Sequence, residues 1–211
     1  MLFDILDKFT DKKICLASGS PRRVEYLKLS GLNFEVLPST FPEDQPPFAF
    51  KDVEEYVLFN SANKAMEVSQ RFDEKPYLVI GCDTVIELNG KVLEKPKSRD
   101  EAIKTLLSLS GKTHHVFSGV TLIFGEDEQV IHFTEKTDVT FSLLPLNLIQ
   151  HYCDTDEPYD KAGAYGIQSA AGCFVKKING DFYNVTGLPL NRLCQEIRNY
   201  CLTEEGMNDS D

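Results

Sequence analysis

The sequence lacks the features that mark secreted, membrane-spanning and disulfide-linked proteins. Its 211 residues contain no apolar run close to the ~18 residues that a membrane span needs. Asp4 and Asp7 interrupt the region where a signal peptide carries its apolar core. Six cysteines occur without a CxxC pair. We therefore expect a cytoplasmic protein with reduced thiols, in which Cys15, Cys82 and Cys173 occupy core or strand contexts.

Positive charge is also scarce. The chain has 22 Lys and Arg residues against 33 Asp and Glu residues, and its formal net charge is -11. A molecule with this charge repels nucleic acids and anionic membranes, so we expect neither as a partner, and any basic cluster must be a local feature. The length suits one large globular domain or two tightly joined lobes, and we predict a single domain over residues 1–202, followed by an acidic, disordered tail at 203–211.

Several familiar nucleotide and metal motifs are absent. The letters GKT at 111–113 resemble the end of a Walker A loop, but Leu106 stands where that loop needs its first glycine. The glycines of 163–172 do not form GxGxxG, and Gly81 replaces the first aspartate of a two-aspartate phosphatase pattern. The four histidines show no metal-ligand spacing. These absences exclude four common ways of handling phosphates or metals.

What is present is a mixed order of strands and helices, typical of an α/β protein. Apolar runs and turn residues predict strands at 13–18, 34–38 and 173–178, a strand from Leu78 that turns back at Asn89 and Gly90, and two long strands joined at GEDE (125–128). Capping residues, glycine stops and apolar spacing predict helices at 21–31, 52–72, 98–111 and 146–153 and after Pro189.

Two arginines stand in the first turn of the first predicted helix, where the helix dipole repels positive charge. Ser20 suits the N-cap position and Pro21 the first helical position. Backbone N–H groups after the small residues beginning at Ser18, together with Arg22 and Arg23, would form an anion site. Alternatively, both arginines point into water at a cost of roughly 0.3–1 kcal/mol. The small hydroxyl-bearing residues favour the anion site.

Three further positions are candidates for chemistry. Asp83 follows a buried apolar run, where a carboxylate can activate water or bind a divalent metal, although a lone aspartate more often starts a turn. The hairpin after it returns the chain at Lys95, which then either meets a phosphate or is solvated. Residues 156–168 suit a metal and phosphate loop in which Gln168 reads a base edge, or a polar surface loop.

Taken in order, the motifs SGSPRR, GCDTV, LEKP, DEPYDKAGAYGIQ and NVTGLPL resemble the Maf family of nucleoside triphosphate pyrophosphatases, in particular its dTTP/UTP branch. The resemblance extends from Ile14 to Ile197. It implies an elongated, two-lobed α/β fold with a mixed sheet and a cleft, similar to the inosine triphosphatase architecture. It also implies a homodimer that hydrolyses triphosphates between the α and β phosphates with a divalent cation.

The resemblance also implies roles for individual residues. The position of Asp83 is that of the family's general base. Cleft positions are matched by Ser18, Arg23, Glu35, Lys64 and Lys95, and positions associated with dTTP/UTP preference by Arg22, Thr84 and Gln168. We predict that Ser18 and Ser20 contact substrate and that Mg²⁺ or Mn²⁺ is held by Asp83 with Glu35. The alternatives are a 7-methyl-GTP pyrophosphatase, a nucleotide-binding regulatory module without hydrolysis, and a nucleotidyl- or sugar-nucleotide transferase.

Overall fold

The computed structural model describes residues 2–125 and 129–208, so the middle of the predicted GEDE turn lies outside the described residues. Its centre is one mixed sheet with the strand order β2-β1-β3-β5-β6-β7, in which β4 also pairs with β3. The two pairings of β1 are parallel and the others antiparallel. The predicted α/β class with a mixed sheet is therefore confirmed. The strands are β1 (Ile14–Leu16), β2 (Glu35–Val36), β3 (Leu78–Leu88), β4 (Lys91–Leu93), β5 (Thr113–Phe124), β6 (Val130–Phe141) and β7 (Val175–Asn179).

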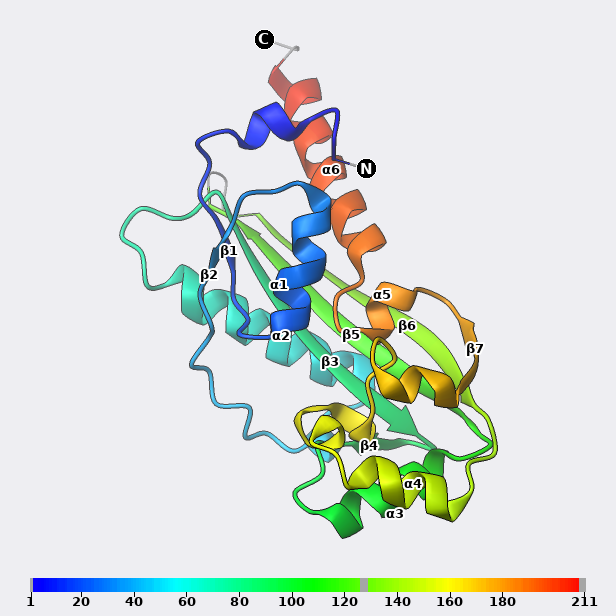
Figure 1. Ribbon diagram of the computed structural model, residues 1–211. Helices are drawn as coiled ribbons and strands as arrows, with labels where there is room; N and C mark the ends of the chain where they lie inside the picture. The colour runs from blue at the N-terminus through cyan, green and yellow to red at the C-terminus, as the bar shows by residue number, and fades with distance from the viewer. Residues whose placement is uncertain (1, 126–128, 209–211) are drawn as a thin grey trace.

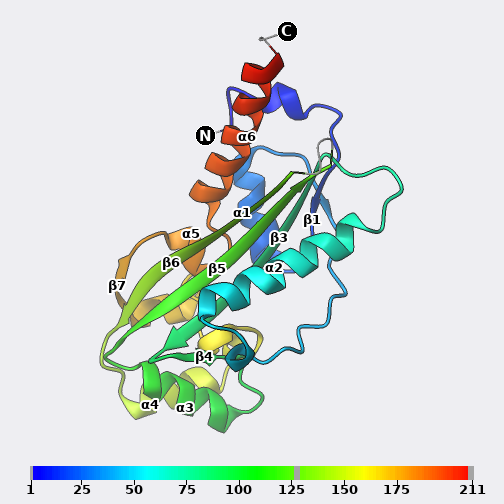
Figure 2. The same cartoon turned by 180° about the vertical axis from the view of Figure 1, so that it is seen from behind.

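Helices lie on both faces of this sheet. The long helix α2 crosses one face, whereas α1 and α6 lie on the other, and α3 and α4 pack together at one end of the molecule (Figures 1 and 2). No helix in the described part of the chain is both long and apolar enough to span a bilayer. The helices are α1 (Pro21–Leu27), α2 (Val53–Ser69), α3 (Arg99–Leu109), α4 (Leu146–Cys153), α5 (Phe182–Val185) and α6 (Leu190–Asn208).

The local signals in the sequence account for most of these boundaries. The side chains of Asp52 and Ser98 cap α2 and α3 by accepting hydrogen bonds from backbone N–H groups. The predicted hairpin joins β3 to β4, and Asn89 and Gly90 both adopt positive φ there. The first helix is shorter than predicted: α1 ends at Leu27, and a 3₁₀ turn continues to Ser30.

Two other expectations differ from the structure. All six cysteines are free thiols, and Cys15 and Cys82 are buried as expected, but Cys173 is exposed. It lies in a 3₁₀ turn because pairing with β6 begins only at Val175. The helix α6 continues to Asn208, well into the segment 203–211 that the sequence predicts as a disordered tail, while residues 209–211 lie outside the described part.

The sheet carries two large apolar clusters, and β3 passes through both. Its first half contributes Leu78 and Ile80 to the cluster beneath α6, and its second half contributes Ile86 and Leu88 to the cluster beside α3 and α4. Asp83 lies between these halves. The strand thus places one carboxylate at the boundary of two packed cores.

The approach of α2 to the sheet depends on glycine. A Cβ atom at Gly81 would lie 2.2 Å from the backbone oxygen of Ser61 and 2.8 Å from the Cβ of Ala65. At Gly119, on the neighbouring strand, a Cβ would lie 2.4 Å from the backbone of Val57. The helix therefore packs directly against the backbones of β3 and β5, which brings its polar side chains close to Asp83.

This close packing predicts that Gly81→Ala destabilises the protein. We expect the free energy of unfolding to fall by about 3 kcal/mol, the upper part of the range for overpacked cores. Gly19→Ala is the matched control, because its added Cβ would lie 3.4 Å from Pro38. Urea unfolding of both variants measures the difference. Equal midpoints for Gly81→Ala and wild type would contradict the packing argument.

Candidate functional site

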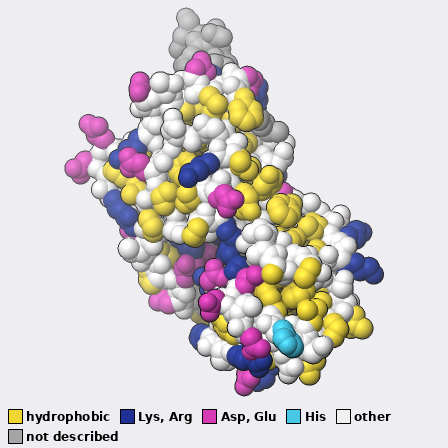
Figure 3. Space-filling model, in the orientation of Figure 1, with side chains coloured by type: hydrophobic (Ala, Val, Ile, Leu, Met, Phe, Trp, Pro, Cys, Tyr) yellow, Lys and Arg dark blue, Asp and Glu magenta, His cyan; other side chains and the backbone are white. Residues whose placement is uncertain are grey.

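A cavity of about 770 Å³ lies beside Asp83, and Figure 3 shows charged side chains of both signs gathered in the hollow at the middle of the molecule. Its wall combines six Lys and Arg residues with four Asp and Glu residues, so this part of an anionic protein carries an excess of positive charge. Nine of the ten predicted site residues line it, namely Ser18, Ser20, Arg22, Arg23, Lys64, Asp83, Thr84, Lys95 and Gln168.

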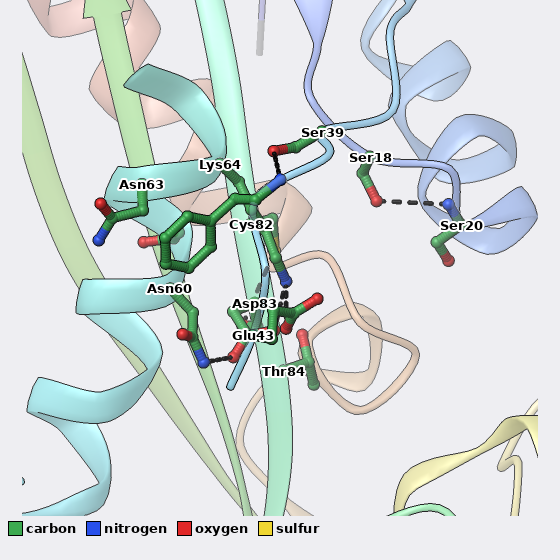
Figure 4. Close-up of polar contacts among 12 residues, drawn as sticks. Ser18, Ser20, Ser39, Glu43, Asn60, Asn63, Lys64, Cys82, Asp83 and Thr84 are labelled. Carbon is green, nitrogen blue, oxygen red and sulfur yellow. Dashed lines mark hydrogen bonds and ion pairs between the residues drawn. The ribbon is translucent and has the colours of Figure 1, made fainter. Parts of the chain in front are cut away.

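Asp83 is held by two residues of α2. Its Oδ1 lies 2.8 Å from Lys64 Nζ, and its Oδ2 accepts a hydrogen bond of 3.0 Å from Asn60 Nδ2 (Figure 4). All three side chains are buried. Burial raises the pKa of Asp83, but the charge and hydrogen bond of Lys64, together with Arg23 and Asn60, outweigh it, so this pKa lies below the ordinary 3.8. The carboxylate is therefore ionised at neutral pH.

Lys64 also contacts a second carboxylate that the sequence analysis did not identify. Glu43 Oε2 lies 2.7 Å from Lys64 Nζ, so one ammonium group joins Glu43 to Asp83 (Figure 4). Glu43 comes from the proline-rich segment between β2 and α2, which has no periodic pattern. The only available signal was an acidic residue between two prolines, Pro42 and Pro46.

Glu35 is not part of this cluster. It lies on the exposed strand β2, pairs with Lys13 at 3.5 Å and does not line the cavity. In the sheet order, β1 separates β2 from β3, which carries Asp83. The expectation that Glu35 and Asp83 share a metal ion is therefore corrected: the carboxylate that the structure brings to Asp83 is Glu43.

Arg23 joins three segments of the wall. Its Nε donates to the backbone oxygen of Gly187 at 2.8 Å, Nη1 to Ser18 Oγ at 3.1 Å and Nη2 to Thr84 Oγ1 at 3.0 Å. Thr84 also contacts Ser118 Oγ at 2.8 Å. These contacts fix the loop after β1 against β3, so Arg23 places its positive charge in the wall in one orientation.

Arg22 and Ser20 lie on the same loop and helix. Arg22 Nη1 is 3.8 Å from Asp160 Oδ2, so the pair links this wall to the segment 156–168. Ser20 occupies the N-cap position of α1 but accepts no hydrogen bond from the helix, and its N–H donates to Ser18 Oγ at 3.3 Å. The predicted capping residue is therefore correctly placed, while its hydroxyl lines the cavity.

Most charged side chains of the segment 156–168 make contacts within the segment or with residues next to it. Glu157 accepts hydrogen bonds from Ser169 and Tyr152, and Lys161 Nζ donates to the backbone oxygen of Glu157 at 2.7 Å. Of its carboxylates, Asp160 is the one that lines the cavity. Gln168 and Lys95 are exposed residues of the cavity wall, which also contains Ile86, Val92, Val116 and Tyr165.

Comparison with known proteins then decides the family. Residues 13–200 match the family model described as Maf-like protein. This chain belongs to the Maf family. It is 51% identical over 191 residues to a dTTP/UTP pyrophosphatase of Clostridium perfringens. The aligned residues cover 90% of this chain and 98% of that protein. A dTTP/UTP pyrophosphatase of Clostridium botulinum is 44% identical over 198 residues, covering 93% of this chain and 99% of that protein.

A human relative extends the comparison to a longer protein. The chain is 40% identical over 207 residues to a human protein named as a probable bifunctional dTTP/UTP pyrophosphatase/methyltransferase. The matched region covers 93% of this chain but 33% of the human protein. The similarity to the human protein thus spans almost all of this chain and one third of the human protein.

Proposed function

We propose that this protein is a nucleoside triphosphate diphosphatase that hydrolyses dTTP and UTP to the monophosphate and pyrophosphate. The observation that carries the proposal is the cavity in which an ionised, buried Asp83 faces an excess of Lys and Arg side chains. The names of the similar clostridial proteins support the same activity. A triphosphate brings about four negative charges, and this wall supplies the cations that offset them.

The arrangement of Asp83 supports a role as general base. Its carboxylate accepts a proton from a water molecule, whose oxygen forms a bond to the α-phosphorus while the bond between that phosphorus and the bridging oxygen breaks. Pyrophosphate leaves with the bonding electron pair. Lys64 keeps Asp83 ionised, and Arg23 holds a fixed positive charge in the wall close by.

The donor set also fits a divalent cation. In the described residues there is no group of three or more His, Cys, Asp and Glu side chains arranged to hold a metal. The carboxylates of Asp83 and Glu43 nevertheless meet at Lys64, and Mg²⁺ binds through one or two carboxylates together with substrate phosphates. We propose that Asp83 and Glu43 hold Mg²⁺ or Mn²⁺, which when bound neutralises phosphate charge.

Base preference is assigned to a second set of residues in the cavity wall. An imide edge presents an acceptor, a donor and an acceptor, and the amide of Gln168 can pair with it. Arg22 and Thr84 complete the set that the family resemblance associates with dTTP and UTP. We propose further that the protein acts as a cytoplasmic homodimer without a nucleic acid or membrane partner, as its charge and the resemblance support.

A side-by-side substrate panel tests this proposal. Pyrophosphate release with Mg²⁺ is expected to show kcat/KM for dTTP and UTP at least about tenfold above CTP and 7-methyl-GTP, since a mismatched hydrogen-bond edge leaves polar groups unpaired. Clear preference for 7-methyl-GTP would assign the chain to the alternative activity. Binding of dTTP without pyrophosphate release would indicate a regulatory module, and dependence on an added acceptor would indicate a transferase.

A further inference from the structure

A row of polar side chains runs along the second half of α2 (Val53–Ser69). Asn60, Lys64, Glu67 and Arg71 follow the spacing i, i+4, i+7 and i+11, which places them in one row on a helix and the turn after it. The first two hold Asp83. The last two contact a different part of the chain, the segment 38–40, only three residues before Glu43.

Glu67 is the centre of that second contact. Its Oε2 accepts hydrogen bonds from Ser39 Oγ at 2.8 Å and from the backbone N–H of Thr40 at 2.9 Å, and its Oε1 accepts one from Thr40 Oγ1 at 3.1 Å. Arg71 donates to both oxygens, at 2.9 and 2.7 Å, and also to the backbone oxygen of Pro38 at 2.9 Å. Hydrogen bonds from Arg71, followed by those of Ser39 and Thr40, lower the pKa of Glu67 to about 2 despite some burial.

Aromatic rings attach the same segment to α2 both before and after Glu43. The ring of Phe41 lies 6.0 Å from that of Phe59, and the ring of Phe50 lies 5.1 Å from Phe59 and 5.2 Å from Tyr56. Residues 38–50, which we term the strap, are thus fastened to one helix at both ends. Between the fastenings the strap contains no strand or α-helix, so these side-chain contacts set where Glu43 lies.

We propose that Glu67 is a positioning residue for catalysis: it holds the strap on α2 in the position that brings Glu43 to Lys64 beside Asp83. The inference deepens the proposed function and rests on it. Glu67 does not line the cavity, and Ser39, which it binds, does. Because Lys64 and Glu67 are three residues apart on one helix, the same element places the buried ammonium group and the anchor of the carboxylate that meets it.

Steady-state hydrolysis of dTTP with Mg²⁺ tests the role in catalysis. Glu67→Ala is expected to lower kcat/KM by roughly five- to thirtyfold, because several charge-assisted hydrogen bonds are lost. Glu67→Gln should lower kcat/KM less than Glu67→Ala does, since its amide oxygen still accepts hydrogen bonds. Glu196→Ala is the matched control: it removes another i, i+4 pair with arginine, on α6, away from the strap and the cavity. Its kcat/KM should equal that of wild type.

A double-mutant cycle separates positioning from a general effect on folding. If Glu67 acts through Glu43, adding Glu67→Ala to the Glu43→Gln variant should lower kcat/KM by less than about twofold. A stability role alone would give the same loss in both backgrounds. Full additivity of the two substitutions therefore overturns the proposal, as does an unchanged kcat/KM in Glu67→Ala.

Hydrogen exchange of the full chain provides a readout that needs no activity. Peptides covering residues 39–51 should exchange faster in Glu67→Ala than in wild type, because the Thr40 N–H loses its acceptor, while peptides of β5 remain unchanged. Unchanged exchange of 39–51 overturns the anchor. Absence of pyrophosphate release from wild type would instead overturn the proposed function, and the exchange result would still decide whether Glu67 holds the strap.

Discussion

Asp83→Asn is expected to reduce kcat for dTTP hydrolysis by about 10²–10⁴-fold, the range typical for loss of a general base. An amide keeps the size of the carboxylate and can still contact Asn60 and Lys64, but it cannot take a proton from water at neutral pH. The variant should therefore fold and bind nucleotide while turning over slowly. Pyrophosphate release at saturating dTTP, with Mg²⁺ present, measures the effect.

Asp154→Asn is the matched control for this substitution. Asp154 also pairs with a cationic side chain, Arg99, at 2.7 Å, but it is exposed and does not line the cavity. Its kcat should be that of wild type. If Asp83→Asn retained turnover within a few-fold of wild type while unfolding at the same urea concentration, Asp83 would not be the base, and the chemistry proposed for the cavity would be wrong.

Lys64→Met is expected to lower kcat/KM for dTTP by about 10²–10³-fold, as the loss of one preorganised electrostatic group does in other enzymes. The methionine retains the apolar stem but removes the charge that joins Asp83 to Glu43. Asp83 and Glu43 would then lose the ammonium group that both contact. Lys104→Met, on the exposed surface of α3, removes a lysine outside the cavity and should leave kcat/KM unchanged.

The pH dependence of Lys64→Met gives a second, more specific result. In wild type, Lys64 holds the pKa of Asp83 below 3.8. Protonation of Asp83 therefore lowers the activity only below that pH. Without Lys64, burial is opposed by the smaller effects of Arg23 and Asn60, so the pKa of Asp83 should rise and the acidic limb of the pH–rate profile should move to higher pH. An acidic limb at the same pH in both proteins would show that Lys64 does not control the ionisation of Asp83.

The residues that sequence analysis placed correctly belong to continuous motifs. Thr84 was identified through the family resemblance. Ser18, Arg22 and Arg23 share one loop and helix start, and Asp83 follows one apolar run, so short-range signals were enough to single them out. The same holds for the hairpin at Asn89 and Gly90, where backbone preference decides the turn. The side chains of Ser18, Arg22, Arg23, Asp83 and Thr84 line one cavity, where hydrogen bonds of Arg23 hold the loop after β1 against β3.

The sequence did not show which of Glu35 and Glu43 lies near Asp83. Both are acidic residues in the stretch before α2, and no spacing rule distinguishes them. Strand order keeps Glu35 away from Asp83, since β1 lies between β2 and β3. The strap places Glu43 beside Lys64 through contacts between residues more than 20 positions apart in the chain. The same limit applies to Glu67, whose acceptors and donors come together only when the strap lies on α2.

The linear order of residues was therefore sufficient for the family, the mixed α/β class, most helix and strand positions and the motif residues of the cavity. These properties depend on local backbone preference, on apolar periodicity and on short motifs, which are all written within a few neighbouring positions. The pairing of Asp83 with Lys64, Asn60 and Glu43 depended on folding, as did the exclusion of Glu35. Long-range packing controls such contacts, because two side chains far apart in the chain meet only after strand order and the close approach of α2 at Gly81 and Gly119 have set their distance.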